Sequence, residues 1–210
     1  MPSDEEIIER IIKGEKQLFE KLIRKYNDRL FRIAMAIIYD EDEARDIMQT
    51  TYLNAYLQLP AIQNKSSFST WLTRILINES LLRKKKKFKQ QQLLNRQPGN
   101  NENETPLKNL LNKELKTLLE KAISDLPEKY KLVFVMREIE EMSISETMEV
   151  LKISESNVKA RLSRAKEILR QNISGKQWKE VYKFKLPLCD KIVNDVMSKI
   201  NNNESRILNQ

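Results

Sequence analysis

The chain has 210 residues, of which 38 are Lys or Arg and 30 are Asp or Glu, giving a formal net charge of +8. This length favours one or two domains, and the positive charge indicates a polyanionic partner: a nucleic acid, a membrane surface or an acidic protein. Only 3 Gly and 6 Pro occur, and alternating apolar residues are scarce. We therefore predict an all-α fold, with two helical domains joined by a flexible linker.

Several kinds of chemistry are excluded by composition. The chain has no histidine, which removes the usual general base near pH 7 and the commonest metal ligand. The single cysteine, Cys189, allows no internal disulfide and no thiolate zinc cluster. No Gly-rich phosphate loop is found. We expect no catalytic residue, no metal and no cofactor.

The N-terminal sequence MPSDEEIIER is acidic and lacks the apolar core of a signal peptide. No run of about 18 apolar residues occurs anywhere in the chain. We therefore expect a cytoplasmic protein without stable membrane insertion.

Four helices are predicted in the first unit, residues 1–87. The first begins at a probable capping box, Ser3 with Glu6, and ends near Gly14. The second covers about 16–39. Asp40 can cap a third helix over about 41–58, which ends near Pro60. A fourth helix is expected over about 67–87, and its Trp71 is interpreted as a core side chain rather than a platform for stacking a base.

The composition changes after this bundle. Residues 88–108 are rich in Gln and Asn and are predicted to form a flexible linker, because they cannot bury enough surface to offset their ordering entropy. Residues 109–173 are expected to form the second helical unit. The extension 174–210 contains one amphipathic segment, LCDKIVNDVMSKI, to which we assign no role.

The second unit has the layout of a helix-turn-helix. Ser143 can cap a helix, a short turn KIS follows, and Ser154 can cap a second helix containing NVKARLSRAKEILR. This second helix has an apolar back, a front of small residues and cations along both sides. A major groove admits one α-helix, so small front residues let the backbone approach the bases while the cations reach phosphates. The alternative is a solvated helix whose arginines form i,i+4 pairs.

Two further features lie in the first unit. The helix over 41–58 carries a polar-to-mixed strip with one exposed Leu, which suits a protein interface but is also typical of a solvated helix face. Residues 83–87 are Arg-Lys-Lys-Lys-Lys. Such a run is usually a solvated helix end, but together with the basic second unit it indicates one long polyanion bound at two places.

The sequence resembles the small extracytoplasmic-function (ECF) group of bacterial sigma factors, the promoter-recognition subunits of RNA polymerase. The resemblance rests on an ordered set: LFEKLIRKYNDRLFRIAMAIIYDEDEARDIMQTTYLNAYLQL, then FSTWLTRILINESLLRKKKK, then LPEKYKLVFVMREIEEMSISETMEVLKISESNVKARLSRAKEIL. The first stretch includes a core-binding signature at Glu43, Asp46 and Gln49. The match covers roughly residues 16–90 and 115–172.

The resemblance implies roles for three groups of residues. Those expected to dock on a helical clamp of the polymerase large subunit are Asp42, Glu43, Asp46, Gln49, Thr50, Leu53 and Asn54. Those expected to recognise the minus-ten element and trap a flipped non-template base are Asn64, Lys65, Ser67, Arg74, Asn78, Arg83, Lys84, Lys85 and Lys86. Those expected to contact the minus-thirty-five element are Ser156, Asn157, Lys159, Ala160, Arg161, Ser163 and Arg164.

The resemblance also implies partners: core RNA polymerase, double-stranded promoter DNA, its melted non-template strand, and an anti-sigma factor as the usual regulator. The chain departs from the family pattern at the turn of the helix-turn-helix, where Lys152 replaces a usual Gly, so Lys152 must be left-handed or the turn must differ. Two other functions remain open: a stand-alone helix-turn-helix regulator whose first unit senses a signal or dimerises, and a basic protein of membrane surfaces.

Overall fold

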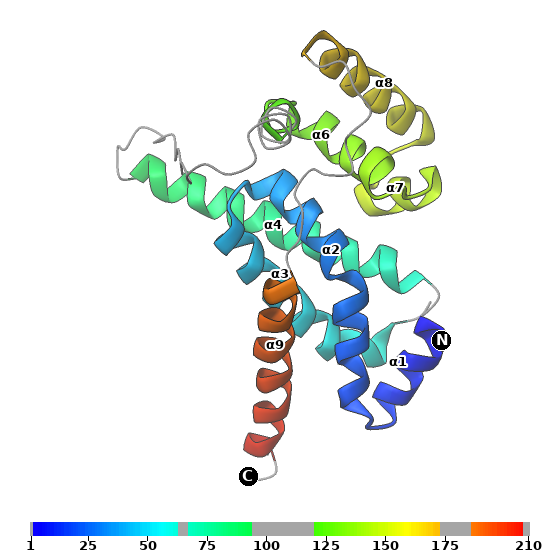
Figure 1. Ribbon diagram of the computed structural model, residues 1–210, viewed down its shortest axis with the longest axis vertical. Coiled ribbons are helices and arrows are strands. Elements are labelled where there is room, and N and C mark those ends of the chain that lie inside the picture. The colour runs from blue at the N-terminus through cyan, green and yellow to red at the C-terminus, as the bar shows by residue number, and fades with distance from the viewer. Residues whose placement is uncertain (1, 63–66, 94–119, 173–185, 208–210) are drawn as a thin grey trace.

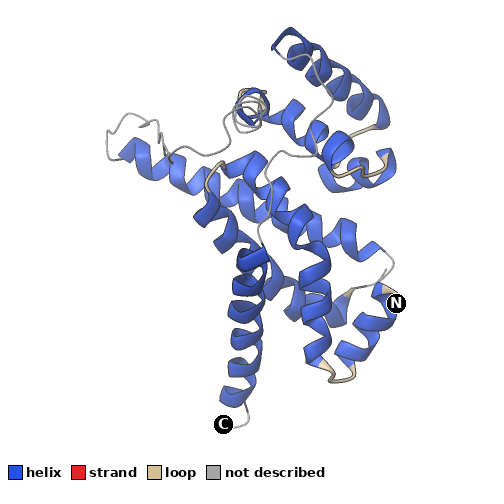
Figure 2. Cartoon of the chain, viewed as in Figure 1, coloured by secondary structure: helices blue, strands red, loops and turns tan. Residues whose placement is uncertain are grey.

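The computed structural model describes residues 2–62, 67–93, 120–172 and 186–207, and within these ranges every regular element is a helix (Figure 2). This confirms the all-α prediction for the described residues. In chain order the elements are α1 (Asp4–Ile12), η1 (Lys16–Leu18), α2 (Phe19–Ile38), α3 (Glu41–Gln58), η2 (Leu59–Ala61), α4 (Phe68–Leu93), α6 (Glu128–Phe134), η4 (Val135–Ile139), α7 (Ile144–Leu151), α8 (Glu155–Asn172) and α9 (Leu186–Ile207).

The predicted signals at the ends of the first helices are present. Ser3 and Glu6 form the expected capping box at α1, and Gly14 takes the positive φ of 109° that lets the chain turn after it. Asp40 caps α3, because its carboxylate accepts a hydrogen bond from the Glu43 amide at 3.0 Å. α2, α3 and α4 pack against one another in the middle of the molecule (Figure 1).

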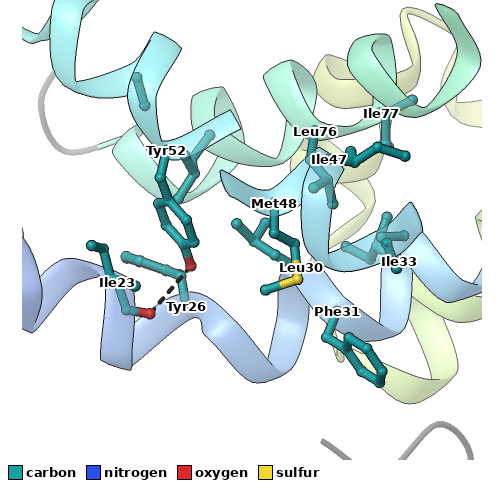
Figure 3. Close-up of a cluster of buried hydrophobic side chains, with 14 of the residues drawn as sticks. Ile23, Tyr26, Leu30, Phe31, Ile33, Ile47, Met48, Tyr52, Leu76 and Ile77 are labelled. Atoms are coloured by element: carbon teal, nitrogen blue, oxygen red, sulfur yellow. Dashed lines mark hydrogen bonds between the residues drawn. The ribbon is translucent and has the colours of Figure 1, made fainter. Parts of the chain in front are cut away.

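The core of the first unit lies between α2, α3 and α4 (Figure 3). One side of α3 is fully buried, and its members are Ala44, Ile47, Met48, Thr51, Tyr52 and Ala55. Tyr52 brings a hydroxyl into this core, where it donates toward the Ile23 carbonyl at 3.2 Å and the Asn27 side-chain oxygen at 3.0 Å. Trp71 packs against Phe68 at the edge of this core, which agrees with its interpretation as a core side chain.

α4 differs from its predicted form in its length. It continues to Leu93, so residues 88–93, which were expected to belong to the linker, are helical. Good helix formers (Lys and Gln) occupy this stretch, and its polar composition does not prevent a helix from continuing into solvent. The side chain of Leu82 has an exposed fraction of 63%, because this end of α4 extends beyond the core. The remainder of the predicted linker, 94–108, lies outside the described residues.

The second unit contains the predicted helix-turn-helix. Ser143 and Glu146 form a capping box at the start of α7, and the Asn157 amide donates to the Ser154 hydroxyl at the start of α8. Between the two helices, Lys152 has φ 53° and ψ 47°, so the left-handed alternative at this position is the one adopted. Val158, Ala165 and Leu169 of α8 are buried, as the apolar back requires.

The two units and α9 pack together into one arrangement. α6 and η4 contact α2, and α7 contacts α4. α9 lies along α3 and α2, on the opposite side from α8 in the view of Figure 1. The described part of the extension 174–210 is therefore attached to the first unit, although it follows the second unit in the sequence.

Candidate functional site

The outward face of α8 is the first candidate surface. Ser156, Asn157, Lys159, Ala160, Ser163 and Arg164 are all exposed, and only Arg161 of the predicted set is half-buried. Three small residues, Ser156, Ala160 and Ser163, lie along the front of the helix, and Glu167 follows them near its end. The side chains of Ser156 and Asn157 are held by the Ser154 hydroxyl, at 3.0 Å each. This capped first turn presents the start of α8 to solvent.

The cations of α8 form short ion pairs that remain open to solvent. Lys159 contacts Glu155 at 2.6 Å and Arg164 contacts Glu167 at 2.6 Å, both along the same helix. The first pair lowers the pKa of Glu155, and the second raises the pKa of Arg164, through the hydrogen bond in each case. Exposed pairs of this kind contribute little to stability, because water screens the two charges. A phosphate can therefore replace the carboxylate at little cost.

The predicted strip on α3 is only partly free. Asp42 and Asp46 are exposed, and so is Thr50, whose hydroxyl donates to the Asp46 carbonyl at 3.0 Å. Leu53 is half-buried against the core. Two members of the set face α4 instead of solvent: Glu43 pairs with Arg83 at 3.3 Å, and Asn54 donates to Glu79 at 3.0 Å.

Gln49, in the middle of the strip, is engaged by α9. Its amide nitrogen donates to Asp195 at 2.7 Å, and its oxygen accepts from Lys199 at 3.3 Å. Gln49 is the residue of the core-binding signature that is bound at both ends of its side chain.

Two of the predicted minus-ten residues on α4 pair with the second unit. Arg74 pairs with Glu149 of α7 at 2.8 Å, and Lys84 pairs with Glu128 of α6. Arg74, Asn78 and Arg161 line one pocket of about 330 Å³ between α4 and the helix-turn-helix. Residues assigned to two separate DNA elements thus meet in one place.

Exposure differs among the members of this set. Asn78, Lys84, Lys85 and Lys86 are exposed, while Arg83 and Ser67 are half-buried. Asn64 and Lys65 lie outside the described residues.

Family models match both units in order. The Sigma-70 region 2 model matches residues 22–88, and the Sigma-70 region 4 model matches residues 116–169. ECF RNA polymerase sigma factor SigW of Bacillus subtilis is 29% identical over 177 residues, covering 79% of this chain and 94% of the relative. RNA polymerase sigma-H factor of Pseudomonas aeruginosa is 26% identical, covering 79% of this chain and 91% of the relative. The chain belongs to the ECF group of sigma factors.

Solved structures share the fold of this ECF sigma factor. CnrH in complex with the cytosolic domain of CnrY superposes with a TM-score of 0.61 at 21% identity, covering 81% of this chain and 96% of that chain. RpoE in complex with the anti-sigma factor NepR from Bartonella quintana gives a TM-score of 0.56 at 19% identity, covering 77% and 96%.

The ECF sigma factor directs transcription initiation, and the alternative of a stand-alone regulator is not favoured, because region 2 accounts for its first unit. In the described residues no cluster of His, Cys, Asp and Glu could hold a metal ion. Within the same ranges, no helix is both long and apolar enough to cross a membrane.

Sequence reasoning missed the residues that connect the parts of this sigma factor. Glu140 is buried between the units and accepts two hydrogen bonds from Arg32, at 2.5 and 3.1 Å. Burial raises the pKa of the Glu140 carboxyl, and the Arg32 hydrogen bond opposes that rise. No local signal identifies Glu140, since it is one of three acidic residues in EIEE. For α9, the amphipathic pattern was visible but its partner was not.

Proposed function

We propose that this sigma factor divides promoter recognition among three surfaces. The strip on α3 binds core RNA polymerase. The segment before α4, the outer face of α4 and its basic end bind the minus-ten element and its melted non-template strand. α8 reads the minus-thirty-five element in the major groove. Residues 1–87 and 109–173 are the corresponding working units, and 88–108 is the connection whose first six positions continue α4.

The observation that carries this proposal is the outward face of α8. Its exposed front has small side chains, and Lys159 and Arg164 flank it in pairs that solvent already weakens. A helix of this form fits a major groove about 12 Å wide, with bases contacted by the front and phosphates by the sides. The capped turn holds the helix for this contact.

The sigma factor is proposed to act as a non-catalytic subunit in the cytoplasm. Separation of the strands then depends on binding energy, since extruding a base costs a few kcal/mol of unstacking. Contacts with the polymerase and with both promoter elements supply this energy together. Nucleotide addition is left to the polymerase.

An anti-sigma factor is proposed as a further partner. Two structural neighbours were solved as complexes, one with the cytosolic domain of CnrY and one with the anti-sigma factor NepR. A regulator of this class would act by covering surfaces that the polymerase needs.

The test is run-off transcription with core polymerase and the K159E/R164E variant. Each lost base or phosphate contact is worth about 1–3 kcal/mol, so promoter-directed transcript should fall by about 30-fold or more. Binding to core polymerase should be unchanged. The matched control is K13E/K21E, which reverses two exposed cations near the turn between α1 and α2 and should transcribe as the unaltered chain does.

Loss of polymerase binding in K159E/R164E would mean that the two surfaces are misassigned. Failure of the unaltered chain to bind core polymerase would refute the proposed function as a whole.

A further inference from the structure

α9 buries an apolar stripe against the first unit. Cys189, Ile192, Val193, Val196 and Ile200 follow a helical spacing, and all five are buried in the same core as α2 and α3. The opposite face of α9 is polar and exposed, as at Lys191, Asn194 and Ser198. The helix is thus a docked element with one apolar side, and neither family model extends over it.

Polar contacts fix the register of α9 on this surface. Asp190 pairs with Arg24 at 2.7 Å, and the Asn27 amide donates to the Cys189 sulfur at 3.0 Å. One turn and more further along, Asp195 and Lys199 hold the two ends of the Gln49 amide. Contacts are therefore made at the start and in the middle of α9, to α2 and to α3.

Docking of α9 occupies Gln49, a residue that is also proposed to bind the polymerase. Gln49 belongs to the strip assigned above to the polymerase, and its amide cannot bind α9 and a second protein with the same groups. An attached helix also competes at a high effective concentration, which reaches the millimolar range for short connections. An external partner can bind the strip only in molecules whose α9 is undocked. Its apparent dissociation constant is therefore the intrinsic constant divided by the undocked fraction.

We propose that α9 is an internal competitor that covers the polymerase-binding strip and must undock before core RNA polymerase binds there. This inference rests on the proposed function, because it requires that the α3 strip is the polymerase site. The surface beneath α9 has an apolar floor from α2 and α3, with Gln49 and Arg24 at its edges. α9 covers this floor with its apolar stripe and pairs with both edge residues.

The first experiment compares two variants, one with an aspartate on the buried face of α9 and one with an aspartate on its exposed face. V196D introduces a charge into the buried stripe and should undock the helix, whereas N194D puts the same group on the exposed face of the same helix. We expect V196D to bind core polymerase at least 10-fold more tightly than the unaltered chain. N194D should bind as the unaltered chain does. Circular dichroism checks that the helical content of the first two units is kept.

The second experiment needs no variant. Cys189 is the single cysteine of the chain, and it lies on the face of α9 that is buried by docking. Its alkylation by iodoacetamide, measured by mass spectrometry of its peptide, therefore reports undocking. We expect saturating core polymerase to increase the alkylation rate at least 10-fold.

The outcomes separate the two proposals. If core polymerase binds while Cys189 stays protected, and V196D binds no more tightly than the unaltered chain, α9 is a permanent part of the fold and the competitor proposal is wrong, although the proposed function stands. If neither the unaltered chain nor V196D binds core polymerase, the proposed function fails and the competitor proposal fails with it.

Discussion

Lys152 shows how a single residue sets the turn of the helix-turn-helix. Its φ of 53° places the Cβ close to the following carbonyl oxygen, at a cost of roughly 1–2 kcal/mol that glycine does not incur. The same left-handed conformation ends α2 at Tyr39, whose φ is 55°. Both residues take the position that glycine occupies at the ends of many helices, with added strain.

Replacing Lys152 by glycine should therefore stabilise the chain. We expect K152G to raise the free energy of unfolding by about 1 kcal/mol, which raises the midpoint of thermal unfolding by about 2–4 °C for a chain of this size. K152A is the control, because it removes the same charge but keeps the Cβ. Calorimetry that gives K152A the same gain as K152G would contradict the explanation by backbone strain.

At the scale of the element, α4 combines a buried half and a solvated half. Its first turns carry Phe68 and Leu72 in the core, whereas residues 84–90 are exposed. Arg83 and Lys87 pair with Glu43 and Asp40. Lys85 and Lys86 are exposed, so a nucleic-acid backbone can approach them without displacing core residues. The helix end is thus suited to phosphate contacts that position the DNA without reading its sequence.

Salt dependence should measure this contribution. Changing exposed Lys85 and Lys86 to Gln should reduce the slope of log K against log salt concentration, for promoter binding by the polymerase complex, by about 1.4–1.8, because each phosphate contact contributes about 0.7–0.9. K13Q/K21Q loses the same charge far from α4 and should leave the slope unchanged. If the slope is also unchanged in K85Q/K86Q, this helix end does not belong to the DNA interface.

At the scale of the molecule, the packed arrangement cannot contact both promoter elements at once. Elements about 25 base pairs apart lie on the order of 85 Å from each other along B-DNA, at about 3.4 Å per base pair. In the structure Arg74 and Arg161, assigned to different elements, line one pocket. The proposed function therefore requires that the two units separate when the sigma factor binds a promoter.

Ion pairs between the units oppose this separation. Arg74–Glu149 and Lys84–Glu128 are half-exposed, so together they contribute on the order of 1 kcal/mol, while Arg32–Glu140 is more deeply buried. E149Q/E128Q should increase the ratio of separated to packed molecules about 5-fold. Small-angle X-ray scattering should detect this as a larger radius of gyration.

The control for this experiment is E155Q/E167Q, which removes two exposed acids that pair only within α8. Its radius of gyration should equal that of the unaltered chain. Equal values for E149Q/E128Q and its control would mean that these pairs do not hold the units together.

The local features of this protein follow from residues that are neighbours along the chain. Caps at Ser3, Asp40, Ser143 and Ser154 and the apolar spacing of α3 and α8 depend on residues within one or two turns of each other, so they can be read along the chain. The exposure of the α8 front could be predicted in the same way, because the front lies opposite the apolar back of the helix. The ordered motifs then indicated the family, which the comparisons confirmed.

Which surfaces are covered depends on contacts between residues that lie far apart in the sequence. Gln49 meets Asp195 across 146 positions of the sequence, and Arg32 meets Glu140 across 108. Periodicity tells which side of a helix is apolar or polar, but not which distant element lies against it, because that choice depends on the shape and charge of both partners in three dimensions. The partners of Gln49, Glu43 and Arg74 therefore emerged only when the helices were assembled.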